Sequence, residues 1–70
     1  MQKPTEFKDW LKNARLNLGM TQKEFAQVMG YSQVYVNYLE HGERFPGIGF
    51  IKRLSEITGT PISDIRELIY

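Results

Sequence analysis

Apolar residues recur at helical spacing along most of this chain, and no segment alternates apolar and polar residues as a half-buried strand would. The first stripe has spacings of three and four residues and consists of Phe7, Trp10, Leu11, Ala14 and Leu18. This spacing puts the whole stripe on one face of a helix, which we expect to begin after an N-cap at Thr5 and to end at Gly19. The pattern predicts an all-α fold.

Two further amphipathic segments follow in the C-terminal part of the chain. Residues 48–58 are expected to form a helix whose inward stripe is Ile48, Ile51 and Leu54. Pro61 suits the first turn of a last helix, which ends near the C-terminus. Its apolar face consists of Ile62, Ile65, Leu68 and Ile69. Helices this short are not stable alone, so we predict that five of them pack into one compact bundle.

The most specific local signals lie between Thr21 and Gly42, where two short helices are predicted one after the other. Thr21 and Glu24 have the spacing of a capping box at the start of the first helix, and Ser32 is a typical N-cap for the second. Gly30 and Gly42 can end these helices in the left-handed conformation. Two helices joined by a tight turn are a helix-turn-helix arrangement, whose second helix fits the major groove of DNA.

Length and composition bound the possible classes of protein. With 70 residues, of which 41% are hydrophobic, the chain is expected to be a single domain over 1–70 with one modest core. No apolar stretch is long enough for a membrane span, and the N-terminus has no signal-peptide pattern, so a cytoplasmic protein is expected. The net charge of +1 supports nucleic-acid binding only weakly, although the first third contains the basic residues Lys3, Lys8, Lys12, Arg15 and Lys23.

The inventory of reactive residues argues against an enzyme. The chain has one His, no Cys, no Gly-rich phosphate loop and no clustered carboxylates. As a metal ligand, His41 would lack a second ligand one helical turn away, because those positions are Asn37 and Phe45. We therefore expect no catalytic residue, no metal, no cofactor and no small-molecule ligand.

The second helix of the pair separates into two faces when it is projected at about 100° per residue. Val36 and Leu39 point inward, with Tyr35 at their edge. The outward residues are Gln33, Val34, Asn37, Tyr38 and His41. Amide side chains can read adenine in the major groove and Val can contact a thymine methyl group, whereas on an arbitrary helix such residues are merely solvated.

Glu40 projects to the flank of the inward face, where an unpaired carboxylate would be costly. Arg15 on the first helix is its natural partner, which predicts a buried ion pair. The alternative is that both residues are exposed charges.

These residues resemble the helix-turn-helix family of lambdoid phage repressors and Cro proteins, which also includes small bacterial regulators. The resemblance extends from Phe7 to about Leu68. It rests on a motif in register that consists of Thr21, Gln22, Phe25, Ala26, Gly30, Ser32, Val36, Leu39, Glu40 and Gly42. The resemblance implies a bacterial or phage-encoded protein that binds double-stranded DNA as a homodimer.

The resemblance also implies roles for individual residues. Gln22 would hold a DNA phosphate and brace Gln33, which would read a base edge. The remaining base-reading positions would be Val34, Asn37 and Tyr38. Contacts to the sugar-phosphate backbone would come from Ser32, Tyr35, His41 and Arg44. Arg15 and Glu40 match the positions of the family's interior ion pair.

Three features of the chain depart from the family pattern. No Lys or Arg lies between Ser32 and His41, and Val28 stands where a polar residue is common. Phe50 and Ile57 are extra apolar residues outside the expected stripe of their helix. Since exposed apolar residues often mark an interface, the dimer candidates are Phe50, Ile57 and Tyr70. The alternative is that they complete a small core.

The leading hypothesis is a transcription regulator, namely a repressor that binds an inverted-repeat operator as a homodimer. An antitoxin with a toxin as partner, or the controller of a restriction-modification locus, would use the same DNA-binding face. A protein of a different class, a protein-interaction module, would use Val34, Tyr35 and Tyr38 as an anchor. Salt distinguishes these classes, because DNA binding weakens steeply as salt rises.

Overall fold

The computed structural model describes the backbone of residues 3–70 and the side chains of residues 6–70. Its helices are α1 (Lys3–Asn17), α2 (Gln22–Met29), α3 (Gln33–Glu40), α4 (Ile48–Thr58) and α5 (Ile62–Ile69). The described part of the chain contains no strand, so the predicted all-α, five-helix fold is confirmed. None of these helices is both long enough and apolar enough to cross a membrane.

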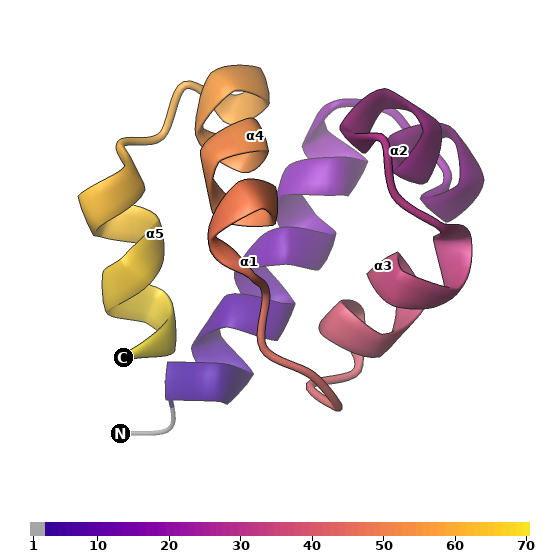
Figure 1. Cartoon of the computed structure of the whole chain (residues 1–70). Helices are drawn as coiled ribbons and strands as arrows, with labels where there is room; N and C mark the ends of the chain where they lie inside the picture. The colour runs from indigo at the N-terminus through magenta and orange to yellow at the C-terminus, as the bar shows by residue number, and fades with distance from the viewer. Residues whose placement is uncertain (1–2) are drawn as a thin grey trace.

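Helix α1 lies at the centre of the molecule and is flanked by two pairs of helices, which also touch each other (Figure 1). The pair α2 and α3 packs on one side, where α3 contacts α1. The pair α4 and α5 packs on the other side, where α5 contacts α1 and α4 contacts α2. This arrangement packs the helix-turn-helix against α1 and α4 and leaves the outer face of α3 uncovered.

The N-caps of α2 and α3, and the glycines that follow both helices, are those that the sequence predicts. The Thr21 hydroxyl accepts from the Glu24 N–H at 3.1 Å, and the Glu24 carboxylate accepts from the Thr21 N–H at 2.9 Å. Ser32 caps α3 by accepting from the Tyr35 N–H at 3.1 Å. Gly30 and Gly42 follow the two helices with φ of 80° and 74°, which a residue with a Cβ adopts only with strain.

The core contains apolar residues from every helix. Its buried members are Phe7, Leu11, Phe25, Ala26, Met29, Val36, Leu39, Phe50, Ile51, Leu54, Ile65 and Ile69. Trp10, Tyr35 and Ile57 pack against it and are half-buried. The described side chains have no buried nitrogen or oxygen atom that lacks a hydrogen-bond partner.

Two predicted features of the apolar pattern of α1 are wrong. The helix begins at Lys3, before the expected N-cap at Thr5. Leu18 lies beyond the last helical residue and is 40% exposed, because the chain has already turned toward α2.

The inward stripe of α4 also differs from the prediction. Ile48 is 57% exposed, whereas Phe50 is fully buried. The rings of Tyr31 and Tyr35 meet the Phe50 ring edge-on, with centroids 5.0 and 5.5 Å away. These two aromatic residues belong to the helix-turn-helix. Because α4 is oriented so that its first turn packs against them, Phe50 lies in the core where Ile48 was predicted.

The three dimer candidates therefore occupy different environments. Phe50 offers no surface, so its assignment to a dimer interface is corrected and the core alternative holds for it. Ile57 is half-buried against the core, and Tyr70 is exposed.

Candidate nucleic-acid interface

Helix α3 has one buried face and one exposed face. Val36 and Leu39 are fully buried and attach α3 to the core, which leaves the residues between them facing outward. Val34 is 60% exposed even though it is aliphatic. The outward face of α3 therefore presents an aliphatic side chain to solvent beside its polar residues.

The side of α3 that faces α2 forms a shallow concave surface, which we call the recognition depression. It is lined by Gln22, Gln33, Val34, Asn37 and Tyr38. Every residue that the sequence analysis assigned to base reading lies here, together with Gln22 from the start of α2. The fold thus brings three carboxamides, one phenol and one aliphatic side chain to a single surface.

Beneath this surface Arg15 and Glu40 form a buried ion pair. Arg15 Nε donates to Glu40 Oε2 at 2.7 Å, and Arg15 Nη2 donates to Glu40 Oε1 at 3.1 Å. Arg15 Nη1 donates to the backbone carbonyl of Met20 at 2.9 Å. The guanidinium therefore joins α1, the turn before α2 and the end of α3, and it is not available to a DNA phosphate.

Gln22 connects this ion pair to the recognition depression. Its Nε2 donates to Glu40 Oε1 at 3.1 Å, and its Oε1 accepts from Asn37 Nδ2 at 3.4 Å. The resemblance implied that Gln22 would brace Gln33, whereas in the structure it braces Asn37, one turn further along α3. The contact depends on how closely α2 crosses α3, which residue spacing does not report.

Ser32 and Tyr35, the first two candidates for backbone contacts, already have structural roles. The Ser32 oxygen caps α3, and its hydroxyl hydrogen is still able to donate to a phosphate. The Tyr35 hydroxyl accepts from the Gly47 N–H at 3.2 Å, and its ring stacks on Tyr31 with centroids 5.2 Å apart. Tyr35 therefore fixes the start of α4 as well as the edge of α3.

His41 and Arg44, the other two candidates, are exposed just beyond α3. His41 Nδ1 lies 2.8 Å from the Asn37 carbonyl oxygen, and because a carbonyl only accepts, Nδ1 carries the hydrogen. The Arg44 guanidinium lies 5.1 Å from the centroid of the Tyr38 ring, which holds this cation beside the recognition depression.

Lys8 and Lys12 are basic residues that the sequence analysis did not assign to the site. They line a groove between α1 and α3, whose other lining residues are Asp9, Arg15, Gln22, Glu40 and His41. Gln22 also lines the recognition depression, so the groove continues that surface toward α1. The available signal was their spacing of four residues, which puts both ammonium groups on one face of α1.

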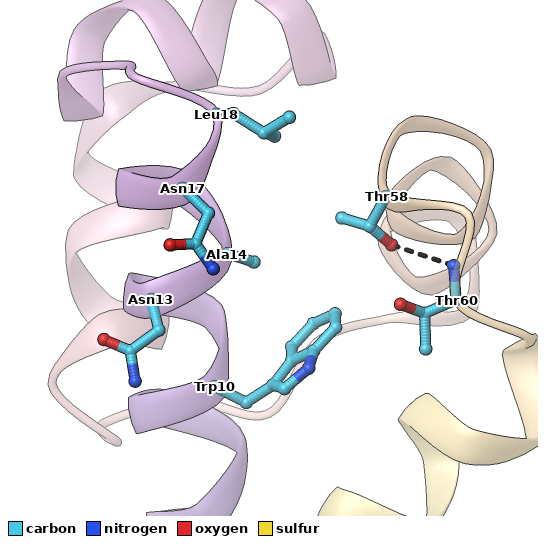
Figure 2. Close-up of a pocket in the computed structure, with 7 residues that line it drawn as sticks. All are labelled: Trp10, Asn13, Ala14, Asn17, Leu18, Thr58 and Thr60. Carbon is cyan, nitrogen blue, oxygen red and sulfur yellow. Dashed lines mark hydrogen bonds between the residues drawn. The ribbon is translucent and has the colours of Figure 1, made fainter.

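A separate hollow lies between α1 and the connection from α4 to α5 (Figure 2). Trp10 extends across it toward Thr60, while Thr58 accepts from the Thr60 N–H at 3.2 Å. No residue of this hollow lines the recognition depression. Trp10, the single indole of the chain, therefore senses the packing of α1 on the C-terminal helices.

Comparison with known proteins agrees with this geometry. A sequence model of the helix-turn-helix family matches residues 11–65. The chain belongs to the helix-turn-helix family. It is also similar, at 36% identity over 50 residues, to YqaF of Bacillus subtilis (strain 168), a protein named as an uncharacterized HTH-type transcriptional regulator. That similarity covers 71% of this chain and 66%, just under two thirds, of the relative. No solved structure matches the chain.

Membership of this helix-turn-helix family supports a function in DNA binding and the regulation of transcription. Proteins of this family are generally not enzymes. The same membership agrees with the five-helix architecture around the α2–α3 pair.

Proposed function

We propose that this helix-turn-helix protein is a sequence-specific repressor that binds DNA with α3 in the major groove. The observation that carries the proposal is the recognition depression, where amide, phenol and aliphatic groups share one surface. Gln33 and Asn37 supply donors and acceptors for base edges, and Val34 supplies an apolar contact for a thymine methyl group.

Cations at two edges of this surface support the proposal. Arg44 lies beside Tyr38, beyond the C-terminal end of α3, and Lys8 and Lys12 lie beyond Gln22 on α1, in the groove that His41 also lines. A helix in the major groove has a sugar-phosphate backbone on either side, so both groups would face phosphate. The small net charge of +1 is compatible with DNA binding if these cations contact phosphate.

We also propose that the protein acts as a homodimer on an inverted repeat. One helix-turn-helix unit contacts only a few base pairs, which is too short a site to be specific. Two α3 helices related by a two-fold axis must lie about 34 Å apart to reach successive major grooves. The chain measures 30 × 23 × 21 Å, which suits this spacing if the subunits meet through Ile57 and Tyr70 in the α4–α5 part, away from α3 (Figure 1).

The test is selection of DNA by the purified protein from a pool of random duplexes, followed by footprinting of the DNA that flanks its own gene. We expect one preferred inverted repeat. Gln33→Ala should then lower affinity for that operator by about 1–3 kcal/mol and relax the preference at one base position, without a change in melting temperature. If Gln33→Ala weakened binding to operator and random DNA equally, Gln33 would contact phosphate rather than a base.

An antitoxin or a restriction-modification controller would use the same surface, and the genes beside its operator would identify which of these the protein is. A protein-interaction module is less well supported. Tyr35, which would be part of its anchor, is half-buried and bonded to Gly47. If binding to the partner did not weaken with increasing salt, this alternative would be favoured over DNA binding.

A further inference from the structure

We infer that Gln22 sets base specificity indirectly, by orienting the Asn37 carboxamide so that Asn37 selects adenine. This inference rests on the proposed DNA binding. Gln22 is then a positioning residue, and Asn37 is the residue that touches the base. A chain of hydrogen bonds runs from the buried Arg15–Glu40 pair through Gln22 to Asn37. Only one assignment of donors and acceptors satisfies every bond in it, and this assignment fixes the orientation of the Asn37 carboxamide.

The first step of this network is fixed by the chemistry of Glu40. An ionised carboxylate only accepts hydrogen bonds, and Arg15 donates to both of its oxygens. Gln22 approaches Oε1 at 3.1 Å, so the end of Gln22 that faces Glu40 must be its NH2 group. The carboxamide of Gln22 therefore cannot be reversed without placing two acceptors against each other.

The second step follows from the first. With its NH2 group directed at Glu40, Gln22 presents Oε1 to Asn37. Asn37 must then direct its own NH2 group toward Gln22, with Nδ2 and Oε1 3.4 Å apart. Asn37 keeps one N–H and both lone pairs of Oδ1 for other partners.

The backbone around Asn37 is also held. Its carbonyl oxygen accepts from the His41 N–H at 3.1 Å and from His41 Nδ1 at 2.8 Å. The side chain is half-buried between α2 and the outward face of α3. Asn37 therefore meets DNA with its carboxamide already oriented, which reduces the entropy lost when it binds a base.

An oriented Asn37 distinguishes the bases. Oδ1 accepts from an exocyclic amino group, which adenine and cytosine present in the major groove and which guanine and thymine lack there. The remaining N–H donates to adenine N7, so that only adenine satisfies both atoms. A reversed carboxamide would exchange the donor and the acceptor and would lose this match.

The experiment compares operator preferences of the full chain and its variants by selection from random duplexes. Asn37→Ala first identifies the position that Asn37 reads, where we expect the parent to prefer adenine. Gln22→Met has a side chain of similar length without either polar atom, and it should reduce the adenine preference there at least about fivefold. The double variant with Gln22→Met and Asn37→Ala should show no further loss of adenine preference than Asn37→Ala alone, because both changes remove the same contact to the base.

Gln33→Met is the matched control, since Gln33 lines the same surface but is not part of the Gln22–Asn37 network. It should change a different base position and leave the adenine preference intact. Melting temperatures verify that every variant is folded. An adenine preference unchanged in Gln22→Met, or a uniform loss at all positions, would overturn the inference and make Gln22 a phosphate contact.

A measurement without DNA separates this inference from the proposed function. In the free protein, the side-chain amide resonances of Asn37 should shift in Gln22→Met and stay in place in Gln33→Met. If they do not respond to Gln22→Met, the inference fails even where the parent selects an operator. If the parent selects no sequence, the proposed function fails and the base-reading inference fails with it, even where the resonances respond.

Discussion

The helix-turn-helix and the α4–α5 pair are built by different means. Helices α2 and α3 follow the N-cap residues Thr21 and Ser32, whose side chains cap the first turn. Helices α4 and α5 follow Gly47 and Pro61, which form no side-chain cap. The first turns of α2 and α3 are therefore fixed by local side-chain hydrogen bonds in addition to packing, whereas the first turns of α4 and α5 have no such cap.

This difference matters for function, because base reading needs side chains held in fixed positions. The Ser32 cap and the buried Arg15–Glu40 pair fix the position of α3, so most side chains on its outer face are not needed to hold the fold together. The first turn of α4 shows the opposite case. Its orientation is set by Tyr31 and Tyr35, two residues of the other part of the molecule.

The largest expected effect tests the dependence of α4 on packing. Phe50→Ala should cost about 3–5 kcal/mol, because it removes a fully buried ring that Tyr31 and Tyr35 enclose. A domain of this size has about 5 kcal/mol in total, so the variant should be largely unfolded at room temperature. The loss in the free energy of unfolding is measured by urea denaturation, with the fluorescence of Trp10 as the signal.

The matched control for Phe50→Ala is Ile48→Ala in the same turn of α4. Ile48 is mostly exposed, so this variant should change stability by no more than about 0.5 kcal/mol. Equal losses in both variants would show that the stripe predicted from the sequence, with Ile48 inside, is the correct one.

Arg15→Ala should have the next largest effect. It leaves the Glu40 carboxylate buried with only the Gln22 amide as partner, at a cost of about 3 kcal/mol. Glu56→Ala removes an exposed ion pair with Arg53, leaves the Arg53 hydrogen bond to the Val28 carbonyl in place, and should cost less than about 1 kcal/mol. A melting temperature of Arg15→Ala close to that of the parent would show that Glu40 is adequately solvated without the guanidinium.

The sequence predicts the helix-turn-helix in more detail than the α4–α5 pair. Caps at Thr21 and Ser32 are local patterns, and they agree with the structure residue by residue. The outward face of α3 follows from helical periodicity. The exchange of Ile48 for Phe50 and the contact between Gln22 and Asn37 are tertiary, because they depend on how helices distant in sequence meet. Periodicity within one segment contains no information about either.

A smaller effect tests the caps themselves. Thr21→Ala should cost about 1 kcal/mol, since it removes the acceptor for the Glu24 N–H and breaks the capping box. Ser63→Ala changes an exposed residue in the first turn of α5, where no side chain caps the helix, and should cost no more than about 0.5 kcal/mol. Similar losses in both variants, measured by thermal unfolding, would remove the distinction between the two pairs of helices.

Replacing Tyr70 should have the smallest effect on stability. Its expected effect is on the assembly of two subunits. Tyr70 is 71% exposed at the end of α5, so Tyr70→Ala should leave the melting temperature of the free chain nearly unchanged. If two subunits meet through the α4–α5 part, the same change removes apolar contact area from each of them. Binding to a single half-site should then be unaffected, while cooperative binding to the full inverted repeat should weaken.

Leu16→Ala is the control for Tyr70→Ala, because Leu16 is a comparably exposed apolar residue on α1, outside the α4–α5 part. It should leave both half-site and full-site binding as they are in the parent. Titrations of one-half-site and two-half-site duplexes at several protein concentrations measure the difference. If Tyr70→Ala binds the full operator as cooperatively as Leu16→Ala, the subunits meet elsewhere. The α4–α5 pair would then serve only to hold α1 against the helix-turn-helix.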